Sequence, residues 1–286
     1  MNIISWNCRG SGGTTVSTLN RYLRCTKATI AFISDTRCCL EKARERVVDS
    51  PLRNFSGVPS NGRSGGLWLL WSDDVIVNIY RSNKFYIFAE VSNKDGSKPW
   101  GLVAVYGDPS KVQNQKIWKE IGEFIDHCDG HACLFGDFNV VMSLDEKSGG
   151  SNELGSPNRQ FREWARSMGL LDLGYHGPAF TWSNRQGGAD NISQRLDRAM
   201  STISWAMSYN ETAVFHLPRF NSDHMPILIR TKPKPIRAKH VFRCENWWSL
   251  KEGFDEVCQK AALNGHEDWR KLKSCFKKEV KGWLGG

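Results

Sequence analysis

Short apolar runs recur along the first 230 residues, and this recurrence is the feature that most narrows the possible folds. Most are rich in branched or aromatic side chains, and several end in a polar residue. Runs of this kind predict buried β-strands, and the amphipathic stretches between them predict helices that cover the sheets. Strands are expected at residues 3–7, 30–34, 67–71, 75–80, 85–91, 102–106, 132–138 and 227–229.

Two of the intervening stretches have clear helical periodicity. Residues 111–128 carry apolar side chains at helical spacing behind Ser110, which is the expected N-cap. Residues 157–168 do the same, with Pro157 suited to the first turn and Gly169 as the stop signal. Both apolar stripes read as core. We therefore expect an α/β (α+β) fold.

The positive charge of the chain is concentrated near its C-terminus. The net charge is +9, of which residues 1–230 contribute +3 and residues 231–286 contribute +6. A basic stretch with Pro233 and Pro235 follows the last predicted strand and reads as an exit from the domain. We expect a domain at residues 1–230 and a basic C-terminal connector at residues 231–286, partly helical.

The connector mixes aromatic and basic side chains, for example in residues 242–248 and 269–278. Such a mixture can grip nucleic acid by stacking and phosphate contacts, and it also fits a solvated amphipathic helix. Nine cysteines without a Cys-x-x-Cys pair predict a reducing compartment, and no apolar stretch approaches the roughly 18 residues of a membrane span. We expect an intracellular protein, nuclear or cytoplasmic and not secreted, with no membrane or obligate protein partner.

Polar side chains at strand ends are the candidates for chemistry. Asp137 and Asn139 follow a strand and should share one face, where they could position a water and a phosphate oxygen. Asp223 and His224 could bind a metal ion or a phosphate. Each pair alone also fits an ordinary turn. Taken together, polar residues at strand ends can converge on one edge of stacked sheets, and the set is Asn7, Tyr106, Asp137, Asn139, Asp197, Asp223 and His224.

Six short strings occur in a fixed order along the predicted domain. They are Ser5–Gly10, Val105–Gly107, Gly136–Asn139, Gly177–Asn184, Arg195–Arg198 and Ser222–His224. In this order they resemble the motif series of the endonuclease/exonuclease/phosphatase superfamily, and in particular the endonuclease domain of plant LINE-type non-LTR retrotransposons, truncated before the reverse transcriptase. The resemblance implies a DNase-like, four-layered α/β sandwich with two central mixed β-sheets.

The resemblance also implies a reaction and a set of roles. The reaction is metal-dependent cleavage of a phosphodiester, most simply DNA nicking by an endonuclease, with Mg²⁺ as cofactor and Mn²⁺ as an alternative. Asp137 would activate the attacking water, and His224, oriented by Asp197, would stabilise the transition state. The implied catalytic residues are Asp137, Asn139, His224, Asp197 and Tyr106; the substrate contacts are Asn7, Arg9, Thr181 and Asn139; and the metal ligands are Asn7, Asp35 and Asp223.

One position departs from the family pattern. Asp35 stands where the resemblance places a glutamate, in the string Ile33–Arg37. The side chain is one methylene shorter, which retracts the carboxylate by about 1.5 Å. A misplacement of about 1 Å in an active site can cost roughly 100-fold in rate, so we expect reduced or metal-shifted activity.

Two alternatives remain beside the DNA-nicking reading. The same fold hosts phosphoesterases that act on RNA or on a phospholipid headgroup. A catalytically impaired retroelement remnant would only bind nucleic acid, and Asp35 motivates that hypothesis. The strings around Thr181 and Asp197 favour nucleic acid, and DNA above RNA, as the partner.

Overall fold

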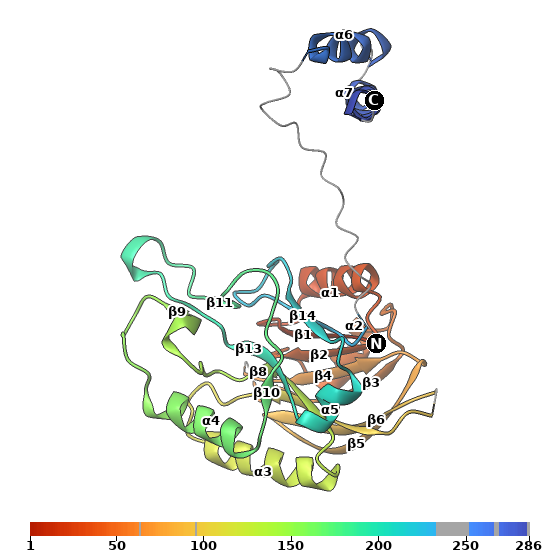
Figure 1. Ribbon diagram of the computed structural model, residues 1–286. Coiled ribbons are helices and arrows are strands. Elements are labelled where there is room, and N and C mark those ends of the chain that lie inside the picture. The colour runs from red at the N-terminus through yellow and green to blue at the C-terminus, as the bar shows by residue number, and fades with distance from the viewer. Residues whose placement is uncertain (63, 95, 233–251, 266–268, 285–286) are drawn as a thin grey trace. The chain divides into compact units, whose positions relative to one another are not determined.

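The computed structural model describes residues 1–62, 64–94, 96–232, 252–265 and 269–284, and the chain divides into two units, Met1–Pro233 and Lys234–Gly286. Two six-stranded sheets form the centre of the first unit (Figure 1). The first sheet has the order β14 (Ala213–His216), β15 (Ile227–Arg230), β1 (Asn2–Asn7), β2 (Ile30–Ser34), β4 (Leu67–Trp71) and β3 (Asn54–Val58). The second has the order β10 (Leu171–Asp172), β13 (Asp197–Ser201), β8 (Ala132–Asp137), β7 (Trp100–Tyr106), β6 (Tyr86–Asn93) and β5 (Val75–Asn83).

Both sheets are mixed. Strands β1 and β2 run parallel, as do β7 and β8, while the other paired strands of the two sheets run antiparallel. A small third sheet joins β11 (Trp182–Ser183), β12 (Ser193–Gln194) and β9 (Lys147–Ser148). Of two single 3₁₀ turns, η1 (Leu144–Glu146) precedes β9, and η2 (Gly188–Asp190) lies between β11 and β12.

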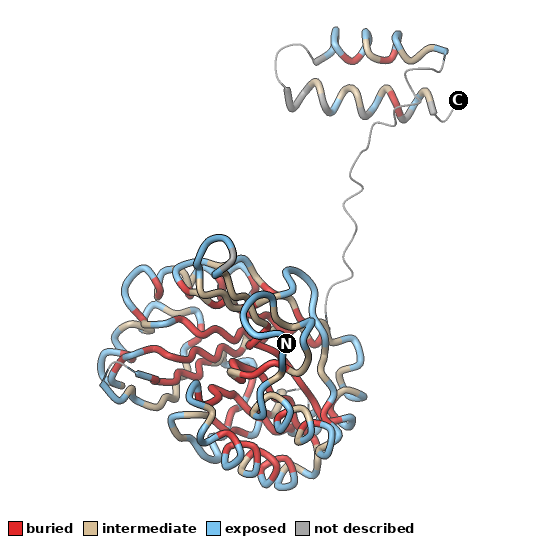
Figure 2. Tube along the Cα trace, turned by 90° about the vertical axis from the view of Figure 1, so that its left-hand side faces the viewer, coloured by how far each residue is buried: buried red, intermediate tan, exposed pale blue. Residues whose placement is uncertain are grey.

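Helices cover the outer faces of the sheets. Helices α1 (Gly13–Thr26) and α2 (Leu40–Arg46) contribute to the apolar cluster on the outer face of the first sheet. Helices α3 (Asn114–His127) and α4 (Ser156–Ser167) do the same on the second sheet, and α5 (Ile203–Ser208) places Trp205 in the core between the sheets. Buried residues follow the strands and the inner helix faces (Figure 2). The predicted four-layered sandwich is confirmed.

Strand alternation decides which side chains reach the space between the sheets. In β1, Ile3 belongs to the core between the sheets, while Ile4 belongs to the core beneath the helices. Because side chains alternate with a period of two, Asn7 continues the inward row of Ile3. In β8, Asp137 continues the inward row of Phe135. Two polar residues therefore lie at the ends of apolar inward-facing rows.

The predicted strands are all present, but one predicted helix start is wrong. Helix α3 begins at Asn114, and the hydroxyl of Ser110 does not cap it. Instead, the carboxylate of Asp108 accepts hydrogen bonds from the backbone N–H of Ser110 at 3.0 Å and of Gln113 at 2.9 Å. This side-chain turn holds residues 108–113 outside the helix, because Asp competes well for backbone N–H groups.

The described part of the second unit contains two helices, α6 (Phe254–Gly265) and α7 (Trp269–Leu284). They pack through Val257 and Val280, and the indole N–H of Trp283 donates to the carbonyl of Glu252 at 3.2 Å. The aromatic and basic segment of residues 242–248 lies outside the described residues. Within the described chain, no helix has the length and apolarity that a membrane crossing requires.

Candidate active site

A polar hollow of about 370 Å³ lies at the ends of β1, β2 and β7. Side chains from eight separate stretches of the chain meet around it, as expected where polar strand ends converge. The lining residues are Asn7, Arg9, Asp35, Arg37, Ser64, Tyr106, Pro109, Lys111, Asn139, Trp182, Gln194, Leu196 and His224.

Three buried side chains are linked at this hollow by one hydrogen bond and one ion pair. Asp197 and Asp137 face each other in register across β13 and β8, and His224 arrives from the loop before β15. The imidazole Nδ1 lies 2.9 Å from Oδ2 of Asp197, and Nε2 lies 3.8 Å from Oδ2 of Asp137. His224 lines the hollow, whereas the two carboxylates lie behind the lining and are each 1% exposed.

The two carboxylates set the charge of the imidazole. Burial alone would lower the pKa of His224, but the negative charges of Asp197 and Asp137 outweigh it and raise that pKa to about 9. Burial raises the pKa of Asp137 to about 6, with the positive charge of His224 opposing and the negative charge of Asp197 assisting. Near neutral pH the site therefore holds an imidazolium beside ionised Asp137.

Two asparagines fix the Asp137 carboxylate. The side-chain amide of Asn7 donates to Oδ2 at 2.9 Å, and the backbone N–H of Asn139 donates to Oδ1 at 2.9 Å. The side chain of Asn139 donates to the carbonyl of Gly107 at 2.8 Å. Asn139 has a left-handed backbone with φ of 54°, so it reaches Asp137 through a turn and not through the predicted strand alternation.

Tyr106 ends β7 opposite Asp137 in the parallel register of β7 and β8. Burial raises the pKa of Tyr106, and the negative charges of Asp35 and Asp137 raise it further. The phenol therefore stays neutral near neutral pH and can donate its O–H to an oxygen in the hollow. This position is consistent with the predicted contact between Tyr106 and a phosphate.

Asp35 lies in a left-handed turn after β2, with φ of 52°. Its Oδ1 accepts the backbone N–H of Gly65 at 3.1 Å. Its Oδ2 accepts two hydrogen bonds from the guanidinium of Arg37, from Nη2 at 2.8 Å and from Nε at 3.2 Å. Arg37 was not among the predicted site residues. The sequence feature that could have indicated it is its position two residues after Asp35.

Asp223 does not line the hollow that contains Asn7 and Asp35. Its Oδ2 accepts hydrogen bonds from Nη1 of Arg9 at 2.6 Å and from the indole N–H of Trp182 at 2.9 Å. Burial would raise the pKa of Asp223, but His224, Trp182 and Arg9 together lower it. Asp223 is thus the partner of Arg9 at a neighbouring hollow of about 320 Å³, and its role as a metal ligand stays a prediction.

Thr181 lies behind the site, fully buried. Its hydroxyl oxygen accepts the backbone N–H groups of Leu196 and Asp197, both at 3.0 Å. The side chain of Thr181 does not reach the surface, and its contact with a phosphate stays a prediction. Thr181 instead holds the start of β13, where Asp197 begins the strand.

Four charged side chains form a buried ion cluster next to Asp197. Arg198, which is fully buried, contacts Glu146 at 2.7 Å and Asp172 at 3.0 Å. Arg195 contacts the same two carboxylates at 2.9 Å and 2.7 Å. In the sequence, Arg195 and Arg198 belong to a motif string that favours nucleic acid. In the structure, their ion pairs join the strand that begins at Asp197 to η1 and β10.

The donor atoms at the hollow suit a hard divalent cation. Asn7 and Asp35 present oxygen atoms there, and no cysteine is among the described lining residues. Asp137, Asp197 and His224 also place one donor atom each within 4.8 Å of one another. With a protonated imidazole this second group is joined by one hydrogen bond and one ion pair, and only with a neutral imidazole would it be a ligand set.

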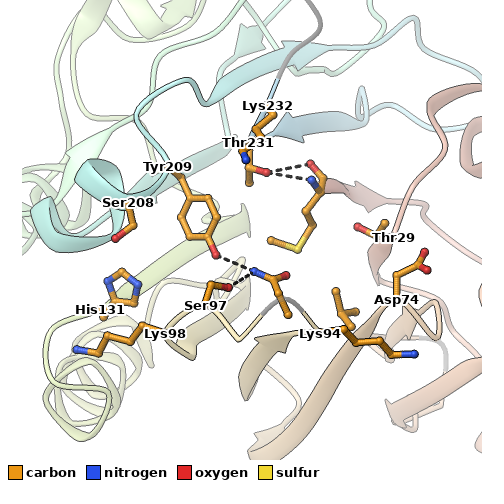
Figure 3. A pocket seen from close by; sticks show the side chains of 13 residues that line it. Thr29, Asp74, Lys94, Ser97, Lys98, His131, Ser208, Tyr209, Thr231 and Lys232 are labelled. Carbon is orange, nitrogen blue, oxygen red and sulfur yellow. Dashed lines mark hydrogen bonds between the residues drawn. The ribbon is translucent and has the colours of Figure 1, made fainter.

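A larger hollow of about 490 Å³ lies at the opposite ends of the strands (Figure 3). Met1 and His131 line it, and they precede the strands that Asn7 and Asp137 end. Because six strand residues span about 20 Å, the two hollows are separated by the length of the sheets. None of the predicted site residues lines it. Its other labelled residues are Thr29, Asp74, Lys94, Ser97, Lys98, Ser208, Tyr209, Thr231 and Lys232.

Comparisons with known proteins agree with the fold described above. The Endonuclease/Exonuclease/phosphatase family matches residues 4–224. The AP endonuclease LMAP from Leishmania major has a TM-score of 0.66 at 16% identity, covering 80% of this chain and 86% of its own. The endonuclease domain of TRAS1, a telomere-specific non-LTR retrotransposon, has a TM-score of 0.60 at 16% identity, covering 80% and 96%.

A 3'-5' exonuclease (NExo) from Neisseria meningitidis has a TM-score of 0.61 at 17% identity, covering 81% of this chain and 100% of its own. At these identities the likeness to solved structures concerns the fold. No match was found among the curated proteins.

Proposed function

Because the chain belongs to the Endonuclease/Exonuclease/phosphatase family, we propose that it hydrolyses phosphodiesters with a divalent cation, and that it nicks DNA as an endonuclease of retrotransposon origin. The observation that carries this proposal is the buried chain from Asp197 through His224 to Asp137 at the floor of a polar hollow. An imidazolium held between two carboxylates is suited to stabilise the negative charge that develops on a phosphate.

Each residue of the site has a chemical task in this proposal. Asp137, ionised above a pKa of about 6, takes the proton of the attacking water. His224 donates a hydrogen bond to the phosphate oxygens, and its positive charge stabilises their negative charge. Asp197 orients the imidazole by accepting a hydrogen bond from Nδ1. Asn7 and Asp35 would hold Mg²⁺, or Mn²⁺ in its place, whose charge would offset that of the phosphate and the leaving oxygen.

The hollows beside the site favour an extended polyanion as the substrate. The central hollow shares Tyr106 with a hollow of about 450 Å³, and it shares Arg9 with the hollow of about 320 Å³. Lys84 lines the first neighbour and Arg185 the second. A track with basic side chains at both ends suits successive backbone phosphates better than a single headgroup.

Arg219 extends the basic lining to a fourth hollow, of about 390 Å³, whose other residues are mostly apolar. Burial lowers the pKa of Arg219, and the positive charge of Arg185 lowers it further. Like-charged side chains that repel each other gain most from a phosphate between them. This arrangement supports nucleic acid above a phospholipid headgroup.

Plasmid nicking tests the proposal. Purified protein with supercoiled plasmid and Mg²⁺ should produce relaxed circles, and EDTA or His224→Ala should abolish them. His127→Ala is the matched control, because His127 ends α3, packs at a tilt against the ring of Tyr80 in β5, and does not line the hollow. Absence of nicking with both Mg²⁺ and Mn²⁺, or faster cleavage of a phospholipid headgroup, would contradict the proposal.

The ion pair between Asp35 and Arg37 favours one competing function. A protein whose metal-binding carboxylate is already neutralised could bind nucleic acid without cleaving it. Retarded migration of a DNA duplex together with no metal uptake in a calorimeter would support this second candidate, which matches a catalytically impaired retroelement remnant.

A further inference from the structure

The negative charge of the Asp35 carboxylate is already compensated by other groups of the same chain. Arg37 donates two hydrogen bonds to Oδ2, and the N–H of Gly65 donates to Oδ1. The carboxylate side chain is only 8% exposed, so it needs a compensating positive charge. A guanidinium on Oδ2 and a divalent cation on the same oxygen exclude each other, since they contend for the same lone pairs and repel.

The turn that carries both side chains is fixed. Asp35 and Arg37 both have left-handed backbones, with φ of 52° and 51°. Such conformations persist in non-glycine residues only where the surroundings hold them. Here the N–H of Gly10 donates to the carbonyl of Asp35 at 2.8 Å, and the N–H of Arg37 donates to the carbonyl of Gly65 at 2.8 Å. The backbone from which the carboxylate projects is therefore held in place.

The guanidinium is the movable partner of the pair. The side chain of Arg37 is 36% exposed, against 8% for Asp35, and it lines the open hollow. Four rotatable side-chain bonds allow it to leave Asp35 without moving the backbone. A phosphate in the hollow would offer it a bidentate partner of the kind that guanidinium groups prefer.

We propose that Arg37 is a built-in competitor of the divalent cation, holding Asp35 until a substrate phosphate draws the guanidinium away and frees the carboxylate for the metal ion. This inference rests on the proposed function and deepens it. Metal and nucleic acid then bind with positive coupling, because each favours the state in which Arg37 has left Asp35.

Calorimetric titration with Mn²⁺ alone tests the competition. Arg37→Gln should bind Mn²⁺ about tenfold more tightly than the unmodified protein, a typical size for such coupling. Arg44→Gln is the matched control, because Arg44 lies on α2 over the ring of Phe55 and not at the hollow, and it should bind like the unmodified protein. Equal or weaker binding by Arg37→Gln overturns the inference.

A second measurement uses the unmodified chain and so does not depend on the folding of a variant. The Nε–H resonance of Arg37 should shift as Mg²⁺ is added, with saturation at the concentration that calorimetry gives. A resonance that stays unchanged while Mg²⁺ binds overturns the inference and leaves the proposed function standing. No metal uptake by any form overturns both.

The coupling has its own test. In a His224→Ala background, which prevents cleavage, a short DNA duplex should tighten Mn²⁺ binding after subtraction of the metal bound by the duplex alone. Adding Arg37→Gln should remove most of that tightening, because no competitor is left to displace. If DNA tightens Mn²⁺ binding equally with and without Arg37→Gln, the proposed exchange of Arg37 between the Asp35 carboxylate and a phosphate is overturned.

Discussion

The imidazole Nδ1 of His224 lies 2.9 Å from Oδ2 of Asp197, with both side chains buried. This hydrogen bond fixes which nitrogen of the imidazole faces the hollow, and it raises the pKa of the ring together with the charge of Asp137. Asp197 is a positioning residue in this arrangement, since it acts on the substrate only through His224.

Replacing Asp197 by Asn should lower both the pKa of His224 and the rate of nicking. The carboxylate is one of the two charges that hold the imidazole protonated, so its loss should move that pKa down from about 9. We expect a fall in kcat of about 100-fold or more, the usual size of a lost acid–base contribution. Titration of the His224 ring by NMR measures the first effect; an unmoved pKa would contradict the assignment.

The rate of nicking should depend on pH as a bell. Asp137 must be ionised to accept a proton, so the rate should rise with pH through about 6. His224 must be protonated, so the rate should fall as pH rises through about 9. Measurement of kcat/KM on a fluorescent duplex across this range checks both limbs. A high-pH limb that persists in His224→Gln would show that another group causes it.

Replacing Arg198 by Met should destabilise the fold. The guanidinium is fully buried against Glu146 and Asp172, and its removal leaves buried negative charge with one fewer partner. Breaking such a pair costs about 3–5 kcal/mol of unfolding free energy, measurable by urea denaturation. Lys119→Ala is the control, because the exposed pair with Glu123 contributes at most about 1 kcal/mol. Equal losses of unfolding free energy in both variants would show that the buried cluster stabilises the fold no more than the exposed ion pair does.

Replacing Asp35 by Glu should raise the nicking rate. The longer side chain carries the carboxylate about 1.5 Å further into the hollow than the aspartate side chain can extend from the same backbone position. An improvement of up to about 100-fold is the scale expected for correcting such a misplacement. Asp35→Asn serves as the control, since it keeps the length and removes the charge. Unchanged nicking by Asp35→Glu would mean that the shorter side chain does not limit the site.

The sequence was enough to predict the strands and their meeting at one edge. Asn7, Tyr106 and Asp137 could be found because each ends an apolar run. The period of two along a strand then predicts on which face of its own strand each side chain lies. The fold class followed from the motif order. The roles assigned to these residues remain predictions until activity is measured.

Features made by distant contacts could not be predicted in the same way. Arg198 belongs to one of the motif strings, yet its ionic partners lie 52 and 26 residues away in the sequence. Thr181 reads as a phosphate contact, yet its hydroxyl serves the backbone of β13. Arg37 was overlooked because the left-handed turn that aims it at Asp35 leaves no periodic signal.

The inward rows of β1 and β8 also limit how such a chain can change over time. Exchange of one apolar residue for another along β8 keeps Asp137 between the sheets. Insertion or loss of one residue in the strand before Asp137 would instead turn the carboxylate toward the helices, with the overall composition almost unaltered. Descendants of this sequence should therefore tolerate many replacements within these strands but retain the odd or even count of residues that leads to each reactive side chain.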